Sequence, residues 1–340
     1  MTNVYFTNKF DSNSIKELFN KVYSDLEIRK DERVAIKVHF GEEGNTKFVS
    51  PKYIEPIIDS LKKINNNFFI TDCNTLYKGM RTNATDHLKL AEEHEFGKLG
   101  KIIIADGEQG DYEETIKING KIFSEAKIGK HIADSDIIIG ISHFKGHELF
   151  GFSGSIKNLG MGCASKAGKQ LQHSNSKPTI NDNCKLCMSC VKMCNYNAII
   201  VDSKLSIDKD ICVGCGKCIS VCDNKAIRTP FFSSSDTQKR TTEYALALKN
   251  KKGIFFNFLN NITKHCDCNK QDSEIVCEDI GIVASIDPVA CDKASYDLVF
   301  KKMNKDIFKE IHKNDGTLSF DYAEEIGLGE KTYKLIEVKD

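Results

Sequence analysis

Eight of the fourteen cysteines fall into two runs of the same spacing, C-x2-C-x2-C-x3-C. Thiolates are the usual protein ligands of iron–sulfur clusters, and a 4Fe–4S cubane takes one thiolate at each of its irons. Three cysteines separated by pairs of residues lie around a tight loop, where each can hold one iron corner. The fourth iron then needs a thiolate from elsewhere. The two runs, 28 residues apart, are Cys184, Cys187, Cys190 and Cys194, and Cys212, Cys215, Cys218 and Cys222.

This spacing resembles that of bacterial ferredoxins with two clusters, in which the last cysteine of each run ligates the other cluster. The resemblance implies two 4Fe–4S clusters with crossed ligand sets. Asn195 and Asp223 stand where the bacterial motif has proline, which costs some rigidity but no ligand. The implied sets are Cys184, Cys187, Cys190 and Cys222 for one cluster, and Cys212, Cys215, Cys218 and Cys194 for the second.

The repeat continues beyond the cysteines, because residues 197–201 follow the first run as residues 225–229 follow the second. Both segments are typical of short strands that close a half-module. Zinc sites or disulfides are the alternatives. Zinc commonly groups cysteines in C-x2-C pairs separated by a longer loop, which is not the pattern here. We therefore predict a small α+β ferredoxin-like insert.

Length and composition indicate that this insert belongs to a larger soluble protein. At 340 residues the chain has room for two or three domains. Basic and acidic residues number 48 each, so the overall charge does not indicate nucleic acid or an anionic membrane as a partner. Residues 1–7 lack the pattern of a signal peptide, and no apolar run is long enough to span a bilayer. We expect a cytoplasmic protein of an anaerobic or low-oxygen cell, since its cysteine content suits a reducing compartment.

The rest of the chain alternates short apolar runs with stretches of helical periodicity. This alternation predicts an α/β domain with a mostly parallel sheet and helices on both faces. The domain is discontinuous: residues 1–175 and 230–340 build it, and residues 176–229 form the insert. Predicted strands are residues 33–38, 67–71, 101–105, 136–141, 253–259 and 282–286, and predicted helices are 14–28, 51–64, 86–96, one through 244–248, and 292–302.

A second site is expected beyond the carboxyl ends of the strands, where open α/β sheets bind ligands. Polar residues collect there, with His39, Asp72 and Asp106 each following a predicted strand. Residues 142–147 follow another strand and contain three candidate catalytic residues. The candidates are His143, Lys145 and His147.

A glycine-rich segment comes next, between residues 146 and 162. Glycines let backbone amides approach an anion or a cofactor closely, and Lys145 and Lys157 supply counter-charges. A structural hinge between domains is the alternative. The predicted cofactor-binding residues are Gly151, Gly154, Lys157, Asn158, Gly160 and Gly162.

Cys266 and Cys268 form a further candidate catalytic pair, just past a predicted strand. Two thiols two residues apart on an extended segment point the same way, so they could bind one soft metal or flank a substrate. Buried, inert cysteines are the alternative. The sequence therefore leaves open an additional metal or a small anionic ligand.

Several segments together are similar to the domain-of-unknown-function 362 family of iron–sulfur centre proteins. The resemblance spans nearly the whole chain and implies an α/β domain with a ferredoxin insert, but no settled reaction. The matching segments are residues 72–77, 143–147, 157–162, 266–268 and 287–288.

Three functions remain open at this point. The first is an iron–sulfur oxidoreductase, in which two clusters deliver electrons to a substrate or metal in the α/β domain. The second is a non-catalytic electron-transfer adaptor that docks a redox partner. Residues 181–229 carry seven basic and five acidic side chains, a net charge of +2, which favours an acidic ferredoxin or flavodoxin. In the third, the clusters only brace a ligand-binding domain.

Overall fold

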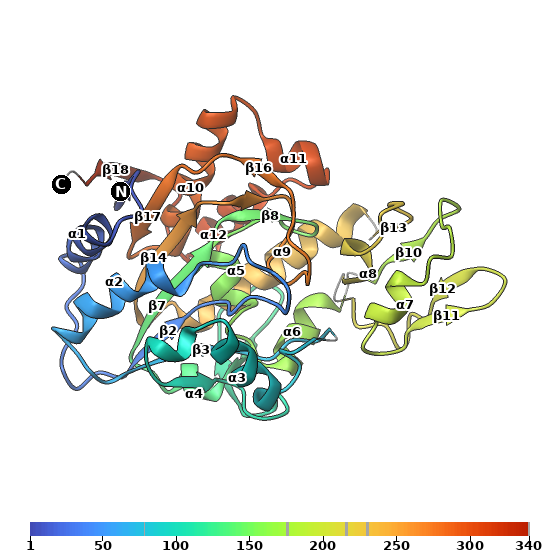
Figure 1. The fold of residues 1–340 in the computed structure, drawn as a ribbon, viewed down its shortest axis with the longest axis horizontal. Coiled ribbons are helices and arrows are strands. Elements are labelled where there is room, and N and C mark those ends of the chain that lie inside the picture. Colours follow the sequence, from blue (N-terminus) through green and yellow to red (C-terminus); the bar gives the residue numbers. More distant parts are fainter. Residues whose placement is uncertain (78, 175–176, 215–216, 229–230, 339–340) are drawn as a thin grey trace.

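An eight-stranded sheet is the centre of the protein (Figure 1). The computed structural model describes residues 1–77, 79–174, 177–214, 217–228 and 231–338. Every strand of the sheet runs in the same direction except β17, which is antiparallel to both of its neighbours. In spatial order the strands are β18 (Tyr333–Glu337), β1 (Thr2–Thr7), β17 (Gly281–Ser285), β14 (Lys252–Leu259), β7 (Ile137–His143), β2 (Val34–Lys37), β3 (Phe68–Asp72) and β4 (Ile102–Ile104).

Both faces of the sheet are buried under helices, as the alternating pattern predicts. Successive residues of β7 show this, since Ile138 packs into one apolar core while Ile137 and Ile139 pack into the other. One core is completed by α1 (Ser12–Tyr23), α2 (Pro51–Lys62) and α3 (Ala84–Glu93). The opposite core contains α5 (Ser155–Gly160), α9 (Phe231–Ala245), α10 (Pro288–Met303) and α12 (Leu318–Glu325). The remaining helical elements of this part are α4 (Lys130–Ala133), α6 (Lys166–His173), α11 (Ile307–His312) and the 3-10 turns η1 (Phe96–Lys98) and η2 (Leu246–Leu248). Three antiparallel strand pairs complete it: β5 (Glu113–Lys117) with β6 (Glu125–Gly129), β8 (Lys145–His147) with β9 (Gly151–Ser153), and β15 (Ile262–Thr263) with β16 (Ile275–Cys277).

The helices differ from their predicted bounds by a few residues. The first helix ends at Tyr23, five residues before the predicted end. The predicted helix at 292–302 begins four residues earlier, at Pro288, because the Asp287 carboxylate accepts hydrogen bonds from the amides of Val289 (2.7 Å) and Ala290 (3.2 Å). The glycine-rich segment is also more regular than a loop, since it forms β8, β9 and α5.

The cysteine-rich segment forms a small module beside the main sheet (Figure 1). Its boundaries were predicted at residues 175/176 and 229/230, which lie outside the described residues. The module repeats its backbone as well as its cysteines, because Asn197 and Lys225, 28 residues apart, both have a positive φ (52° and 51°). Its elements are β10 (Thr179–Ile180), α7 (Ser189–Met193), β11 (Ile199–Val201), β12 (Leu205–Ile207), α8 (Lys217–Ser220) and β13 (Ile227–Arg228).

Within the described residues, no helix combines the length and the apolar character needed to cross a membrane.

Candidate functional site

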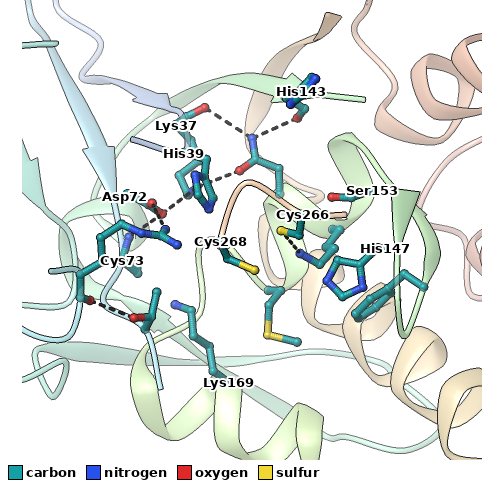
Figure 2. A pocket seen from close by; sticks show the side chains of 18 of the residues that line it. Lys37, His39, Asp72, Cys73, His143, His147, Ser153, Lys169, Cys266 and Cys268 are labelled. Carbon is teal, nitrogen blue, oxygen red and sulfur yellow. Dashed lines mark hydrogen bonds and ion pairs between the residues drawn. The ribbon is translucent and has the colours of Figure 1, made fainter. Parts of the chain in front are cut away.

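The main cavity opens at the carboxyl ends of β2, β3 and β7, where the sheet topology predicts a ligand site (Figure 2). It holds about 890 Å³ of space, part of it open to solvent. The hairpin β8–β9, helices α5 and α6, and the turn at residues 266–268 close its other sides. Among the described residues, its lining includes five cationic side chains, Lys37, Arg81, Lys145, Lys157 and Lys169, and one carboxylate, Asp72.

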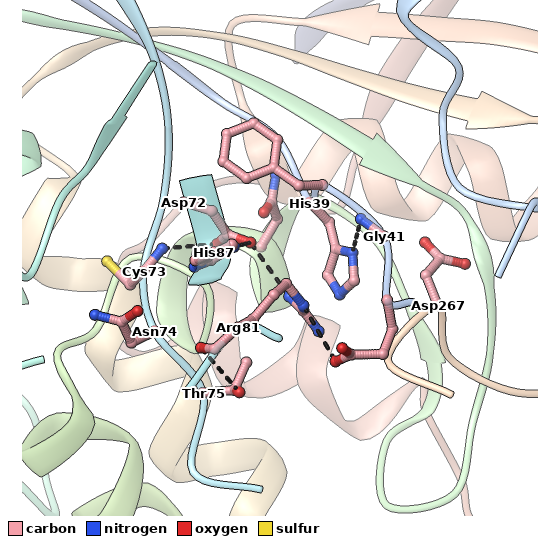
Figure 3. Close-up of polar contacts among 12 residues, drawn as sticks. His39, Gly41, Asp72, Cys73, Asn74, Thr75, Arg81, His87 and Asp267 are labelled. Carbon is pink, nitrogen blue, oxygen red and sulfur yellow. Dashed lines mark hydrogen bonds and ion pairs between the residues drawn. The ribbon is translucent and has the colours of Figure 1, made fainter. Parts of the chain in front are cut away.

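Asp72, at the end of β3, organises one wall of this cavity (Figure 3). Because β2 and β3 are adjacent and parallel, the Lys37 ammonium at the end of β2 lies 3.0 Å from the Asp72 carboxylate. Arg81 contacts the other carboxylate oxygen at 3.3 Å and also pairs with Glu42 at 3.4 Å. Burial raises the pKa of Asp72, but Lys37, His87 and Arg81 outweigh it and hold that pKa below its ordinary value. The wall is therefore a buried network of fixed charges.

The two other polar residues predicted at strand ends have different surroundings. His39 lines the cavity, and its Nδ1 accepts a hydrogen bond from the Gly41 amide (3.0 Å), so the proton of the neutral ring is on Nε2. Burial lowers the pKa of His39 well below its ordinary value. Asp106 does not line this cavity. It accepts hydrogen bonds from the backbone and side-chain amides of Asn74 (2.9 and 3.0 Å), and burial raises its pKa to about 6.

The glycine-rich segment contributes side chains to the cavity more than a backbone cradle. The amides of Ser155 and Ile156, at the start of α5, donate to the buried Asp292 carboxylate at 2.6 and 2.9 Å. Because these two amides already bind the Asp292 carboxylate, they do not offer a site for an added anion. Asn158 instead accepts a hydrogen bond from Lys37 (2.8 Å) and donates to the Ile141 carbonyl (3.1 Å), which ties α5 to the sheet.

The predicted glycines divide into two groups. Gly154 and Gly162 line the cavity, as do Lys157 and Asn158. Gly151 and Gly160 do not. A Cβ on Gly160 would lie 2.0 Å from the Thr241 carbonyl oxygen of α9, and Gly151, at φ +75°, packs against the backbone of residues 314–316. These two glycines serve close packing and turn geometry.

Cys266 and Cys268 face the cavity from a tight turn closed by a hydrogen bond from the Asn269 amide to the Cys266 carbonyl (3.1 Å). Figure 2 shows both sulfur atoms directed into the cavity. The hydrogen bond between the two side chains lowers the pKa of Cys266 well below the ordinary thiol value and raises that of Cys268. Lys157, with its Nζ 4.0 Å from the Cys266 sulfur, and a hydrogen bond with His147 lower the pKa of Cys266 further. Cys266 is therefore the more acidic of the two thiols.

The backbone amide of Leu149 orients the His147 ring toward the Cys266 sulfur. Its Nδ1 accepts a hydrogen bond from the Leu149 amide (3.1 Å), so a neutral ring carries its proton on Nε2 and donates it to Cys266. Burial lowers the pKa of His147, which keeps the ring neutral at pH 7. The predicted candidates Cys266, Cys268 and His147 thus meet in one place.

His143 and Lys145 have a different role in the structure. Both bind the buried Asp267 carboxylate, through His143 Nδ1 and Lys145 Nζ, each at 2.8 Å. His143 Nε2 faces the Asn260 carbonyl oxygen (2.9 Å), so both ring nitrogens are engaged. These two residues fix the turn that carries Cys266 and Cys268.

Several residues of the site were not singled out from the sequence. Asp267 was overlooked between the two cysteines, although a carboxylate flanked by thiols on a buried turn needs a partner. The sequence does contain a signal for Lys37, because it is a charged residue inside an otherwise apolar predicted strand. Arg81 and Lys169 lie outside the predicted strand ends and reach the cavity only through the fold.

The cysteine module contains two further cavities, and their linings separate the cysteines as the crossed ligand sets require. Cys184, Cys187, Cys190 and Cys222 line one cavity. Cys212, Cys218 and Cys194 line the other. Cys215, the remaining member of the second set, lies outside the described residues. Among the described cysteines, the last one of each run therefore lines the cavity that holds the earlier cysteines of the other run.

Backbone amides also face the two crossed sulfur atoms in equivalent ways. The Ala198 amide donates to Cys194 Sγ (3.3 Å), and the Ala226 amide donates to Cys222 Sγ (3.2 Å). Hydrogen bonds to the ligand sulfur atoms are among the features that set the reduction potential of an iron–sulfur cluster. In the described part of the chain, no three His, Cys, Asp or Glu side chains are grouped to hold a single metal ion, either here or around Cys266. A cubane differs from an ion because its ligands bind separate corners, so the cysteine arrangement fits the cluster better than one metal.

The module contacts the main cavity through its second cysteine run. Lys217, in α8, donates hydrogen bonds to the Cys268 carbonyl and to the Asn269 side chain. Its ammonium also lies 4.7 Å from the ring centroid of Tyr77, which lines the cavity. Ile219 packs against an apolar cluster of Leu149, Phe150 and Met161. The second set of cysteines is therefore the one next to the cavity.

Fold and site together define an α/β protein with a cationic, thiol-containing cavity and an adjoining cysteine-rich module. The chain belongs to the family described as Domain of unknown function (DUF362), whose model matches residues 34–297. This match confirms the family resemblance read from the sequence.

Other likenesses are partial. The indolepyruvate oxidoreductase subunit IorA of Archaeoglobus fulgidus is 44% identical over 50 residues, which are 14% of this chain and 8% of IorA, so the chain spans a small part of that protein. The lactate racemase apoprotein of Thermoanaerobacterium thermosaccharolyticum is 13% identical with a TM-score of 0.39, covering 75% of this chain and 50% of its own. A Thermotoga maritima protein is 12% identical with a TM-score of 0.44, covering 87% and 59%.

Proposed function

We propose that this protein is an iron–sulfur redox enzyme in which two 4Fe–4S clusters in the cysteine module serve a substrate bound in the main cavity. The contact of Lys217 with Cys268 carries the proposal, because it joins the second cysteine run to the turn that bears the cavity thiols. The likeness to an oxidoreductase subunit over 50 residues supports a redox role.

The crossed cysteine sets are the proposed cluster ligands. Clusters held in this way supply one-electron transfer at low potential. Cys187 is exposed and belongs to the first set, whereas the second run, which carries Lys217, adjoins the cavity. This arrangement suits entry of electrons at the first set and their use near the second.

Within the cavity, the chain's own residues have distinct proposed roles. Cys266 presents a thiolate, which Lys157 and the Nε2–H of His147 stabilise. Cys268 holds the neighbouring proton, so it can donate a proton to a bound substrate. His143, Lys145 and Asp267 position the turn. Cys266, Cys268 and His147 therefore remain our candidate catalytic residues.

A non-catalytic adaptor is the second candidate. The net charge of +2 on residues 181–229 and the exposed Cys187 favour docking of an acidic one-electron donor such as a ferredoxin or flavodoxin. The redox enzyme is preferred because an adaptor has no use for a buried, stabilised thiolate beside five cationic side chains.

Metal and acid-labile sulfide analysis of anaerobically purified protein tests the proposal, with the Cys266→Ala/Cys268→Ala double variant as a matched control. Both proteins are expected to contain about eight irons and eight sulfides. An iron content that is lower in the double variant than in the wild type would instead indicate a metal bound in the cavity. A chain without iron and sulfide contradicts the proposal.

A further inference from the structure

The charge of the main cavity is unbalanced. Of its five cationic side chains, Lys37 and Arg81 pair with Asp72 or Glu42, and Lys145 pairs with Asp267. Lys157 and Lys169 have no carboxylate oxygen within 4.0 Å among the described residues. The Nζ of Lys157 has the Cys266 sulfur at 4.0 Å. Lys169 interacts electrostatically with Asp106, a carboxylate that does not line the cavity and makes no direct ion pair with Lys169.

Lys169 is an unusual place for a charge without a directly contacting counter-ion, because the residue has a relative exposure of only 7%. Its Nζ donates to the Ala164 carbonyl, which uses one of its three protons. A buried ammonium without a counter-ion is costly, so such groups are normally paired. Figure 2 shows the Lys169 side chain extending from α6 into the cavity that holds the two thiols.

The neutral groups around these lysines do not supply the missing charge. Burial lowers the pKa of His147 and that of His173, to about 3 for His173, so both rings are neutral at pH 7. Apolar side chains on the lining, Leu76, Phe150 and Met161, give the cavity the mixed character of a small-molecule site.

We infer that the cavity binds a small organic anion, a carboxylate or phosphate, whose charged group lies at Lys169 and Lys157 and whose neighbouring atoms face the Cys266 sulfur. This inference rests on the proposed use of the cavity as a substrate site and names the class of that substrate. The Asp292 carboxylate already occupies the amides at the start of α5, so the lysine side chains, and not that helix end, recognise the anion.

The test uses two alkylating reagents of nearly the same size, anionic iodoacetate and neutral iodoacetamide. Their rates at Cys266 are measured by mass spectrometry of the Cys266 peptide in the anaerobic holoprotein. The iodoacetate-to-iodoacetamide rate ratio is expected to be about tenfold or more above the ratio for a free cysteine peptide, because a cation a few ångströms away stabilises the bound anion. Inorganic phosphate is expected to suppress this excess.

Three variants of α6 make the test specific. Lys169→Gln is expected to lower the ratio several-fold, and Lys169→Arg to retain it because the charge remains. Lys166→Gln, on the same helix but not on the cavity lining, serves as the control and should leave the ratio unchanged. A wild-type ratio equal to that of the free peptide, or one indifferent to Lys169→Gln, overturns the inference.

Iron content and cluster absorbance of the same samples keep this outcome separate from that of the proposed function. A raised ratio in a chain without clusters supports the anion site and contradicts the redox proposal. Full cluster content with the rate ratio of a free cysteine peptide contradicts the anion site and leaves the redox proposal supported.

Discussion

At the residue scale, the Cys266 sulfur has donors on several sides, from Cys268, His147 and Lys157. An ordinary thiol has a pKa near 8.5, so its alkylation slows about twentyfold or more between pH 8 and pH 6.5. Because the pKa of Cys266 is lowered, we expect its alkylation by iodoacetamide to slow less over this range than that of an ordinary thiol. The pH–rate profile, followed on the Cys266 peptide, measures this.

Two variants of Cys268 test whether its hydrogen bond to Cys266 lowers the pKa of Cys266. Cys268→Ala removes the hydrogen bond to Cys266 and is expected to shift the profile to higher pH, whereas Cys268→Ser keeps a donor and should shift it less. A wild-type profile parallel to that of a free cysteine peptide would contradict the thiolate assignment.

The buried Asp267 carboxylate contacts both the His143 ring and the Lys145 ammonium. Asp267→Asn leaves Lys145 buried without its counter-charge and is expected to lower the free energy of unfolding at pH 7 by about 3–5 kcal/mol. Denaturant unfolding measures the change, with Asp321→Asn as an exposed control. A loss no larger than that of the control would refute the pairing.

The pH dependence of this effect has a definite sign. The pKa of Asp267 is below its ordinary value, since His143 and Lys145 outweigh the effect of burial. Its stabilisation is therefore fully present above the unfolded-state pKa of about 4 and declines as the pH falls below it. The difference between wild type and Asp267→Asn should narrow in acid.

At the element scale, the contact between α5 and α9 explains a glycine that looked like part of a cofactor cradle. A Cβ at Gly160 would meet the Thr241 carbonyl oxygen at 2.0 Å. Gly160→Ala must therefore push the two helices apart, and we expect a loss of about 1–3 kcal/mol in the free energy of unfolding. An unchanged unfolding midpoint, measured in denaturant, would show that the helices are not packed this closely.

The same elements show how far the sequence could predict the structure. The cysteine spacing and the apolar strands are local patterns, so the small module and the mostly parallel sheet could be expected from them. Cys266 and His147 were each candidates from a short motif, but their contact was not predicted. The cap that Asp292 of α10 places on α5 joins residues 137 apart in the chain, and no local pattern predicts it.

Lys169 and Arg81 illustrate the other limit. Neither belongs to a motif, and each reads as an ordinary exposed charge in a polar stretch. Both are buried in the folded chain, where they line the cavity. Their roles depend on tertiary structure, which periodicity does not encode.

At the scale of the whole molecule, Lys217 is one of the residues that join the module to the cavity. Removing its hydrogen bonds in Lys217→Ala should loosen the turn at residues 266–269, so we expect faster hydrogen exchange of its amides, including Asn269. Lys204→Ala, at an exposed position of the same module, is the control. Equal exchange in the two variants would argue against a module held by this contact.

The central claim is that the module holds two clusters with crossed ligands. Electron paramagnetic resonance of the anaerobic, dithionite-reduced protein tests it most directly. Two reduced 4Fe–4S clusters close together should give about two spins per chain and a broadened, interacting signal. Cys194→Ser is expected to affect the same cluster as Cys212→Ser, and Cys222→Ser the same cluster as Cys187→Ser, each leaving about one spin in a simpler spectrum. A reduced protein without a cluster signal, or variants that pair by run instead of by crossed set, would contradict the account.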